Sequence, residues 1–389
     1  MLRLWMRIFY SLALNATQPP TDKTFANKKK AAEILQKVWQ AQPNHPGVVH
    51  YLIHSDDTQQ LAELGLPAAM CYAKIAPAVP HALHMPSHIF TRLGLWDEAI
   101  KSNLASQAAA RAMMTAKGLS GASREQLHAM DYLAYAYLQT GRDSDARHVL
   151  AELKAIERVD EPVFSVAYAA TAIPARLALE RRDWGAAESL ELPDNVRMLA
   201  PLANFKWAEA HIHFARAVGA ARSGNPVLAR EEAAKLGALE QSLAVPPGTY
   251  DWRKPMAVER QTAEAWIARQ EGKPDEAIRL MRAAADLDDA TEKHPVTPGS
   301  ILPAREQLGE LLLDLGRPGE ALAEYEASLK RSPRRLAGLH GAARAAKLAG
   351  DRSKAGRYYA ELAEVTRRSD GTLLEVKEAR AFPSELAGQ

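Results

Sequence analysis

A short marker recurs along this chain: a turn residue followed, five positions later, by an alanine. Its seven occurrences are Gly94/Ala99, Gly141/Ala146, Arg182/Ala187, Gly224/Ala229, Gly272/Ala277, Gly316/Ala321 and Gly350/Ala355. Successive turn residues lie between 34 and 48 positions apart. A marker that repeats at this interval is typical of proteins built from stacked units, each of which buries its apolar face only against its neighbours. The chain is therefore expected to form an array of small helical units.

The clearest unit covers residues 301–333, ILPAREQLGELLLDLGRPGEALAEYEASLKRSP. It predicts a helix, a Gly-Arg-Pro-Gly turn and a second helix that ends at Ser-Pro. The spacing of a tetratricopeptide repeat is matched by Leu308, Gly309, Leu312, Gly316, Ala321, Tyr325 and Pro333. We expect the small residues Gly309 and Ala321 to lie where the two helices of the unit cross most closely.

Length and composition agree with a helical array. With 389 residues the chain is too long for one compact core, and 47% hydrophobic with 25% charged residues is an ordinary globular balance. Alanine is abundant and aromatic residues make up only 6%, which favours closely packed helices over sheets. We predict an all-α, right-handed superhelical solenoid of antiparallel helix pairs, whose first helices line a concave surface.

The pattern divides the chain into four stretches. These are an incomplete N-terminal helical repeat (1–44), divergent repeats that carry a His-rich concave face (45–255), three regular repeats (256–367) and a C-terminal tail (368–389).

The first fourteen residues predict an amphipathic helix. Its apolar side chains at helical spacing are Leu2, Trp5, Met6, Phe9, Leu12 and Ala13. Such a face must be buried somewhere. Either the preceding half of this repeat is missing from the chain, or residues 1–14 dock on a partner or support self-association.

Half of the twelve histidines fall in two windows, HPGVVHYLIH at 45–54 and HALHMPSHIF at 81–90. His50 and His54 are four residues apart, as are His84 and His88, so each pair shares one face of a helix. His128 and Asp131 form a further pair, three residues apart, one repeat later.

The repeat register predicts that these groups meet. Counting from the turn and alanine markers, they fall at positions 2, 5 and 9 of three consecutive first helices, and these positions face the concave groove. Imidazoles that converge from facing helices are suitable ligands for one divalent transition metal, such as Zn, Cu, Ni or Fe. The alternative is that the rings bond to backbone carbonyls left free by Pro80 and Pro86.

Other polar residues near the predicted groove are candidates for ligand contacts. Those that could hold a carboxylate-bearing ligand or a peptide tail are Tyr51, Arg92, Gln139, Arg222 and Arg269. Asp56 and Asp57 could fix a histidine tautomer, or could simply lie at a solvated helix end. His45 and His81 stand at expected helix starts, where a capping or loop role is more usual.

Several function classes lack their motifs. Both histidine pairs read HxxxH rather than HExxH, and the sequence has no GxSxG, no CxxC and no Gly-rich phosphate loop. The single cysteine, Cys71, rules out an intramolecular disulfide framework. A net charge of +2 without a basic run gives no footprint for nucleic acid, and no segment predicts a transmembrane helix.

Four segments resemble an uncharacterised family of bacterial tetratricopeptide-repeat proteins that carry HPGxxHYxIH followed by HMPSHI. They are FYSLALNA, PNHPGVVHYLIH, HALHMPSHIFTRLGLWDEAI and VTPGSILPAREQLGELLLDLGRPGEALAEYEASL. The resemblance spans most of the chain and implies the repeat fold, but no reaction. Members of that family extend further upstream and often carry an export signal. We expect a cytoplasmic protein as the sequence stands, and an exported one if a longer native N-terminus exists.

These observations favour a tetratricopeptide-type binding or scaffold protein. Its concave groove would take a protein or peptide, and a His-lined pocket there would hold one transition metal at most. The first alternative is a metal-dependent enzyme that uses the same histidines with an open coordination position and a bound water. The second is a purely structural interaction array whose histidines are satisfied internally.

Overall fold

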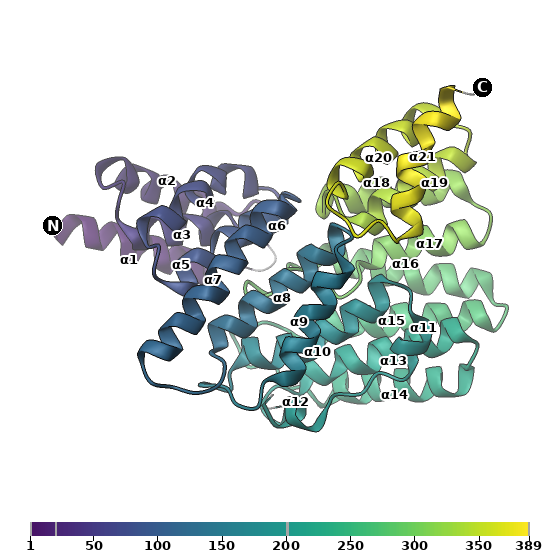
Figure 1. Cartoon of the computed structure of the whole chain (residues 1–389), viewed down its shortest axis with the longest axis horizontal. Coiled ribbons are helices and arrows are strands. Elements are labelled where there is room, and N and C mark those ends of the chain that lie inside the picture. The colour runs from purple at the N-terminus through teal and green to yellow at the C-terminus, as the bar shows by residue number, and fades with distance from the viewer. Residues whose placement is uncertain (1, 20–21, 200–201, 388–389) are drawn as a thin grey trace.

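The computed structural model describes residues 2–19, 22–199 and 202–387. The regular elements in this part of the chain are helices joined by loops, and its only β pairing is one isolated bridge between Ala122 and Val159. It confirms the predicted all-α solenoid of helix pairs. Helices next to each other in the sequence pack side by side along the whole array (Figure 1).

The N-terminal half contains four helix pairs and part of a fifth. Their elements are α1 (Leu2–Ala16), α2 (Ala26–Ala41), α3 (Pro46–Asp56), α4 (Ala62–Ile75), α5 (Pro80–His84), α6 (Pro86–Arg92), α7 (Trp96–Ala116), α8 (Arg124–Gln139), α9 (Asp143–Ala155) and α10 (Phe164–Glu180). In the third pair, α5 and α6 together take the place of one first helix.

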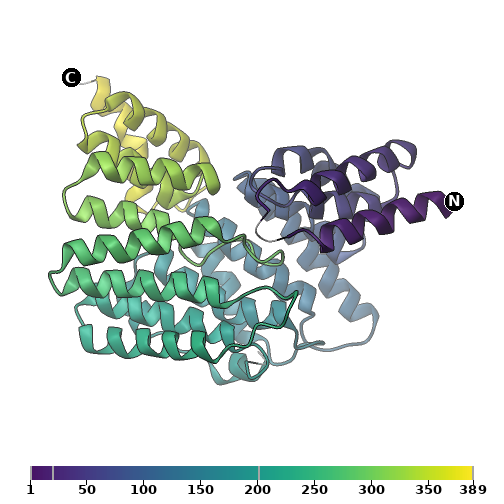
Figure 2. The same cartoon turned by 180° about the vertical axis from the view of Figure 1, so that it is seen from behind.

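The C-terminal half continues the stack, which is seen as regular rows from behind (Figure 2). Its elements are α11 (Trp184–Glu188), α12 (Asp194–Leu199), the 3-10 turn η1 (Lys206–Ala208), α13 (Glu209–Ser223), α14 (Pro226–Ser242), α15 (Arg253–Gln270), α16 (Pro274–Ala290), α17 (Ala304–Asp314), α18 (Pro318–Arg331), α19 (Leu336–Leu348), α20 (Arg352–Val365) and α21 (Leu374–Ala387). The expected tail therefore contains a helix, α21, which packs against α20 and α19.

The turn and alanine markers have a direct structural cause. All seven turn residues adopt left-handed backbone angles, with φ from 51° at Arg182 to 87° at Gly224. Glycine reaches this region without strain and ends a helix there. The seven marker alanines are all buried, as expected for small residues where two helices pack closely.

Tyr325 organises the most regular repeats. It projects from α18 and is buried between Gly309 of α17 and Gly341 of α19. A Cβ atom added at Gly341 would lie 2.2 Å from the Tyr325 ring, and one added at Gly309 would lie 2.7 Å from it. Three helices can pack around one aromatic ring only because both flanking positions lack a side chain.

The solenoid coils until its two halves touch. Trp96 donates its indole N–H to the carbonyl oxygen of Arg334 at 2.7 Å. The neighbouring Arg335 is fully buried and bonds to Glu180, Glu306 and Tyr135. These contacts bring the loop between α18 and α19 against α8 and α10, more than 150 residues earlier in the chain.

The loop between α16 and α17, residues 291–303, crosses the concave side of the N-terminal half, and we call it the strap. Lys293 lies 3.2 Å from a carboxylate oxygen of Asp57. Tyr168 and Arg176 of α10 both donate hydrogen bonds to the carbonyl oxygen of Gly299, at 3.2 and 2.7 Å. The groove that the sequence analysis left open for a partner is therefore occupied here by the chain's own strap.

Helix α1 forms as predicted and leaves much of its apolar face uncovered within this chain. Ile8 and Ser11 are its buried residues, whereas the predicted apolar face, including Trp5, Met6 and Phe9, stays exposed. The side chain of Leu2, like residues 1 and 388–389, lies outside the described part of the chain. Among the described residues, no helix combines the length and apolar character that a membrane span requires.

Substitution of the glycines around Tyr325 tests this packing. We expect Gly341→Ala to lower the free energy of unfolding by about 1–3 kcal/mol, because the new methyl group overlaps the Tyr325 ring. Gly319→Ala is the matched control, since an added Cβ there meets nothing within 4 Å, and its effect should stay within about 0.5 kcal/mol. Urea denaturation followed by circular dichroism measures both, and equal effects of the two variants would contradict the packing described.

Candidate metal centre

Two prolines set the position of the second histidine pair. Pro80 and Pro86 begin α5 and α6, where a missing backbone N–H costs nothing. Only Met85 separates the two helices, and it keeps helical angles, with φ −50° and ψ −37°. His84 and His88 therefore remain one turn apart on one face, despite the break.

His84, His88 and His128 form an inner cluster between α5, α6 and α8. Their candidate ligand atoms all lie within 4.8 Å of one another. The Nε2 atoms of His84 and His88 are 3.1 Å apart, and the rings of His84 and His128 are 4.1 Å apart between centroids. All three side chains are buried, so this cluster is largely shielded from water.

His50, His54 and His81 form an outer cluster between α3 and α5. The Nε2 atom of His50 lies 3.1 Å from the Nε2 atoms of both His54 and His81. These residues are only partly buried, and 40% of the His81 side chain is exposed. A position at a helix start predicts a cap or loop role for His81, but α5 directs this ring toward His50 of α3.

The two clusters are neighbours. The rings of His54 and His88 are 6.1 Å apart between centroids, and those of His81 and His84 are 6.4 Å apart. Six imidazoles from α3, α5, α6 and α8 thus form one continuous group, which includes all five histidines that the sequence analysis singled out.

Hydrogen bonds fix the tautomer of His84. Asn103 donates its side-chain N–H to the carbonyl oxygen of Ala99 at 2.8 Å, which turns its Oδ1 atom toward His84. This oxygen lies 2.6 Å from Nδ1 of His84 and can only accept. Nδ1 of His84 must therefore carry the proton, and its Nε2 atom presents a lone pair.

The tautomer of His88 follows from Asp57 in the same way. Although burial opposes its charge, Lys293 and Arg92 hold the pKa of Asp57 well below its ordinary value, so the group is a carboxylate. Its Oδ2 atom lies 3.1 Å from Nδ1 of His88 and accepts a hydrogen bond from the N–H group at that position. Nε2 of His88 therefore also presents a lone pair.

The two lone pairs point at each other across 3.1 Å. This contact is repulsive unless a cation or a shared proton lies between the nitrogens. Protonation is disfavoured, because burial lowers the pKa of both His84 and His88. A metal ion about 2.0–2.1 Å from each nitrogen removes the conflict.

The outer cluster has a related mismatch. A neutral imidazole nitrogen either donates one hydrogen bond or accepts with one lone pair, yet Nε2 of His50 has two ring nitrogens at 3.1 Å. Burial, together with the neighbouring His81 and His88, lowers the pKa of His50 to about 4. The His81 ring faces His50 with its Nε2 atom, and its other nitrogen, Nδ1, lies 3.6 Å from a carboxylate oxygen of Glu125. Glu125 is therefore placed like a group that orients a metal-binding histidine.

The remaining candidates have other neighbours. Asp131 forms a buried ion pair with Arg176 and does not reach the histidines. Arg92 binds Asp57, Gln139 accepts from the backbone N–H of Leu336, and Arg222 binds Glu310 and Asp314. Tyr51 lies beside the ring of His50, and Nε of Arg269 has no hydrogen-bond partner in the described chain.

The alternative prediction is that these histidines bond to backbone carbonyl oxygens left free by Pro80 and Pro86. The ring nitrogens of His84 and His88 are paired with side chains and with each other. The structure gives them no bond to a backbone carbonyl within the described residues. Each cluster offers three nitrogen donors, which is one fewer than a tetrahedral ion takes.

Comparison with known proteins identifies the repeat. Residues 302–335 match the family model described as tetratricopeptide repeat, and this stretch covers the unit recognised in the sequence. A search of curated proteins gave no match.

Among solved structures, the chain is similar to a tetratricopeptide repeat protein from Parabacteroides merdae, with 12% identity, a TM-score of 0.38 and coverage of 78% of this chain and 98% of that one. For yeast Tom70 the identity is 13%, the TM-score 0.39 and the coverage 97% and 92%. For NprR in complex with its cognate peptide NprX the identity is 10%, the TM-score is 0.47, and the match covers 99% of this chain and 99% of that one. Similarity at this level says nothing about what the chain binds.

The tautomers can be measured by nitrogen NMR on protein labelled at histidine. We expect His84 and His88 to keep the proton on Nδ1, because Asn103 and Asp57 can only accept. Addition of Zn²⁺ should shift their Nε2 signals without removing the Nδ1 proton. The exposed His148 provides the reference, and an unprotonated Nδ1 at either residue would disprove the assignment.

Proposed function

We propose that this chain is a tetratricopeptide-type binding protein whose inner and outer histidine clusters hold two transition-metal ions side by side. The observation that carries the proposal is the pair of lone pairs on His84 and His88, which need a cation between them. Ligand sets made only of imidazole suit Zn, Cu, Ni or Fe. The sequence resemblance to a bacterial family with both histidine segments supports placing the chain in that family.

The first effect of the metal ions would be to stabilise the packing of neighbouring helices. The ligands come from the first helices of three consecutive helix pairs, α3, α5 with α6, and α8, so the ions would join neighbouring repeats of the array. A protein or peptide partner is expected from the repeat fold. Because the strap fills the concave side of the N-terminal half, such a partner would use another surface or displace the strap.

A metal-dependent enzyme is the second candidate, and the exposure of the outer cluster favours it. Three histidine ligands with a water in the fourth position are typical of catalytic zinc. The His81 side chain is 40% exposed, so water and a small substrate could reach an ion there. Hydrolytic or oxidative turnover that is lost with His81→Ala would support this candidate.

Metal analysis of protein purified without a histidine tag tests the proposal. We expect about two ions per chain in the wild type and about one in His84→Ala and in His88→Ala. A metal at 100 times its Kd should stabilise the wild type by about 2.7 kcal/mol, and chelator should reverse the effect. His148→Ala, on the exposed face of α9, is the control and should behave as the wild type. Metal content and melting temperature unchanged in His84→Ala would overturn the proposal.

Asp57 provides a separate test, because it contacts a ligand and not the ion. Asp57→Asn should weaken metal binding at the inner cluster by about 10–100-fold, since the carboxylate no longer fixes the His88 ring. Competition with a chelator of known affinity measures the change. An affinity equal to that of the wild type would show that Asp57 does not orient His88.

A further inference from the structure

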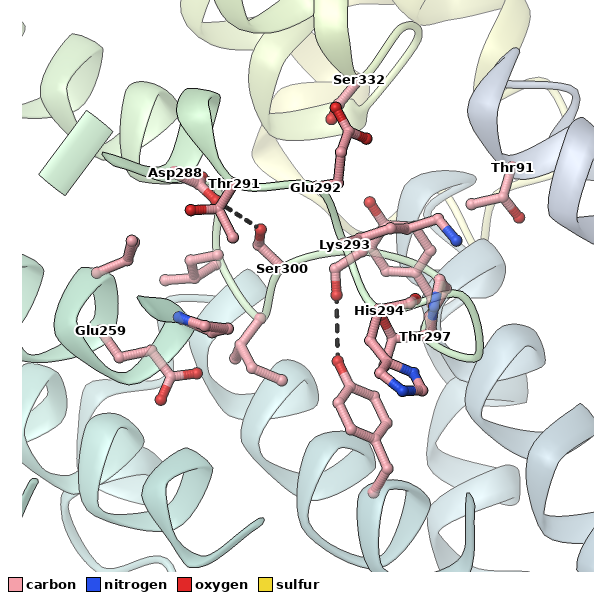
Figure 3. A pocket seen from close by; sticks show the side chains of 18 of the residues that line it. Thr91, Glu259, Asp288, Thr291, Glu292, Lys293, His294, Thr297, Ser300 and Ser332 are labelled. Carbon is pink, nitrogen blue, oxygen red and sulfur yellow. Dashed lines mark hydrogen bonds between the residues drawn. The ribbon is translucent and has the colours of Figure 1, made fainter. Parts of the chain in front are cut away.

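A second polar site lies beneath the strap, apart from the six histidines of the metal centre. It is a cavity of about 100 Å³ between the strap and helices α10, α13, α15 and α16. Glu259 and Asp288 lie on one side of it, and Lys293 and His294 of the strap lie on the other (Figure 3). None of the six clustered histidines lines this cavity.

Glu259 is the group in the cavity that most needs a partner. It projects from α15 and is only 8% exposed. Its Oε2 atom has no hydrogen-bond partner within the described chain. A buried polar atom without a hydrogen-bond partner is unfavourable for the fold, so this carboxyl group is available to bind a ligand.

His211 of α13 faces the same carboxyl group. The Thr171 hydroxyl lies within hydrogen-bond distance of the carbonyl oxygen of Ala167 and of Nδ1 of His211, 3.0 Å away. When this hydroxyl donates to Ala167 it accepts from Nδ1 of His211, and Nε2 of His211 then presents a lone pair. It lies 3.8 Å from Oε1 of Glu259, too far for a direct hydrogen bond but close enough for one donor group to reach both.

Aromatic rings form the rest of the lining. Trp252 stacks on Trp207 with ring centroids 4.0 Å apart, and the ring of Tyr250 lies 4.9 Å from that of Trp252. Trp252, Tyr250 and Tyr168 all line the cavity. The negative faces of such rings attract cations and favour apolar groups that carry them.

Three groups on neighbouring helices act on Glu259, whereas the cations that also line the cavity have other partners: Lys293 and Arg92 pair with Asp57, and Arg331 pairs with Asp289. Arg176 of α10 lies near it but is already paired with Asp131. Asp288 of α16 adds negative charge, and His211 is neutral because burial lowers its pKa to about 3. Burial raises the pKa of Glu259 to about 8, against the effect of Arg176 and with that of Asp288. The group is therefore mostly an uncharged acid at pH 7, and ionises when a cation arrives.

We propose that this cavity binds a small organic ammonium ion. Its N–H groups would donate to Glu259 and to Nε2 of His211, and its alkyl part would lie against Trp252 and Tyr250. An apolar ligand would leave the carboxyl group without a partner, an anion would meet Glu259 and Asp288, and a metal ion would find too few ligands close together. The site is independent of the metal proposal, because no ligand of the metal centre takes part in it.

The test is calorimetric titration of chelator-treated protein with n-propylammonium, and with n-propanol as the uncharged probe. Chelator treatment excludes binding of the amine to metal. We expect saturable binding of n-propylammonium, and at least tenfold weaker binding of n-propanol. Glu259→Gln should lose at least tenfold in affinity while keeping its melting temperature. Glu264→Gln, on the same helix but paired with Arg260 outside the cavity, should bind as the wild type.

Proton release gives a second readout. At pH 7 binding should release about one proton, because the ammonium ion forces Glu259 to ionise. The affinity should be about tenfold lower at pH 6 than at pH 7. Titrations in buffers of different ionisation enthalpy measure the release, which Glu259→Gln should abolish. If that variant does not fold, His211→Gln replaces it in the affinity comparison. The proposal is overturned by undetectable binding, by equal affinity for n-propanol, or by unchanged affinity in the cavity variant.

Discussion

The rest of the structure depends on one constraint: two imidazole lone pairs, on His84 and His88, face each other in a buried site. Asn103 and Asp57 each accept a hydrogen bond from Nδ1 of one histidine, and the lone pairs of His84 and His88 therefore face each other with their Nε2 atoms 3.1 Å apart. Each bond alone is an ordinary satisfied contact, and only their combination creates a need for positive charge. A buried imidazole pair resists protonation, so the four residues together favour the metal ion that we propose, and that ion would join α5, α6 and α8 to one another.

The coiling of the solenoid connects this centre to the distant half of the chain. Lys293 of the strap approaches the same carboxylate that orients His88, and it helps to keep that carboxylate ionised. The strap also encloses the aromatic cavity around Glu259. One loop of the chain thus contributes to two sites, and movement of the strap would change the electrostatics of both. The buried Arg335 holds the two halves at the distance at which these contacts form.

Local patterns were sufficient to predict the fold. The turn positions could be predicted because a left-handed residue is followed five positions later by a buried alanine. This includes Arg182, which is not a glycine but has a positive φ. Repeat register also brought His84, His88 and His128 together correctly. The register argument failed for Asp131, which faces a buried arginine, and the helix-start rule failed for His81, whose direction depends on how α5 packs. The roles of Asn103, the strap and Glu259 could not be predicted, because they depend on contacts between residues far apart in the sequence.

The most direct measurement of the central claim is anomalous X-ray diffraction at a metal absorption edge, on crystals of protein purified without a tag and supplied with Zn²⁺. This account predicts one peak about 2.0–2.1 Å from the Nε2 atoms of His84, His88 and His128, and a second peak among His50, His54 and His81. Well-ordered rings without a peak between His84 and His88, at full metal supply, would contradict it.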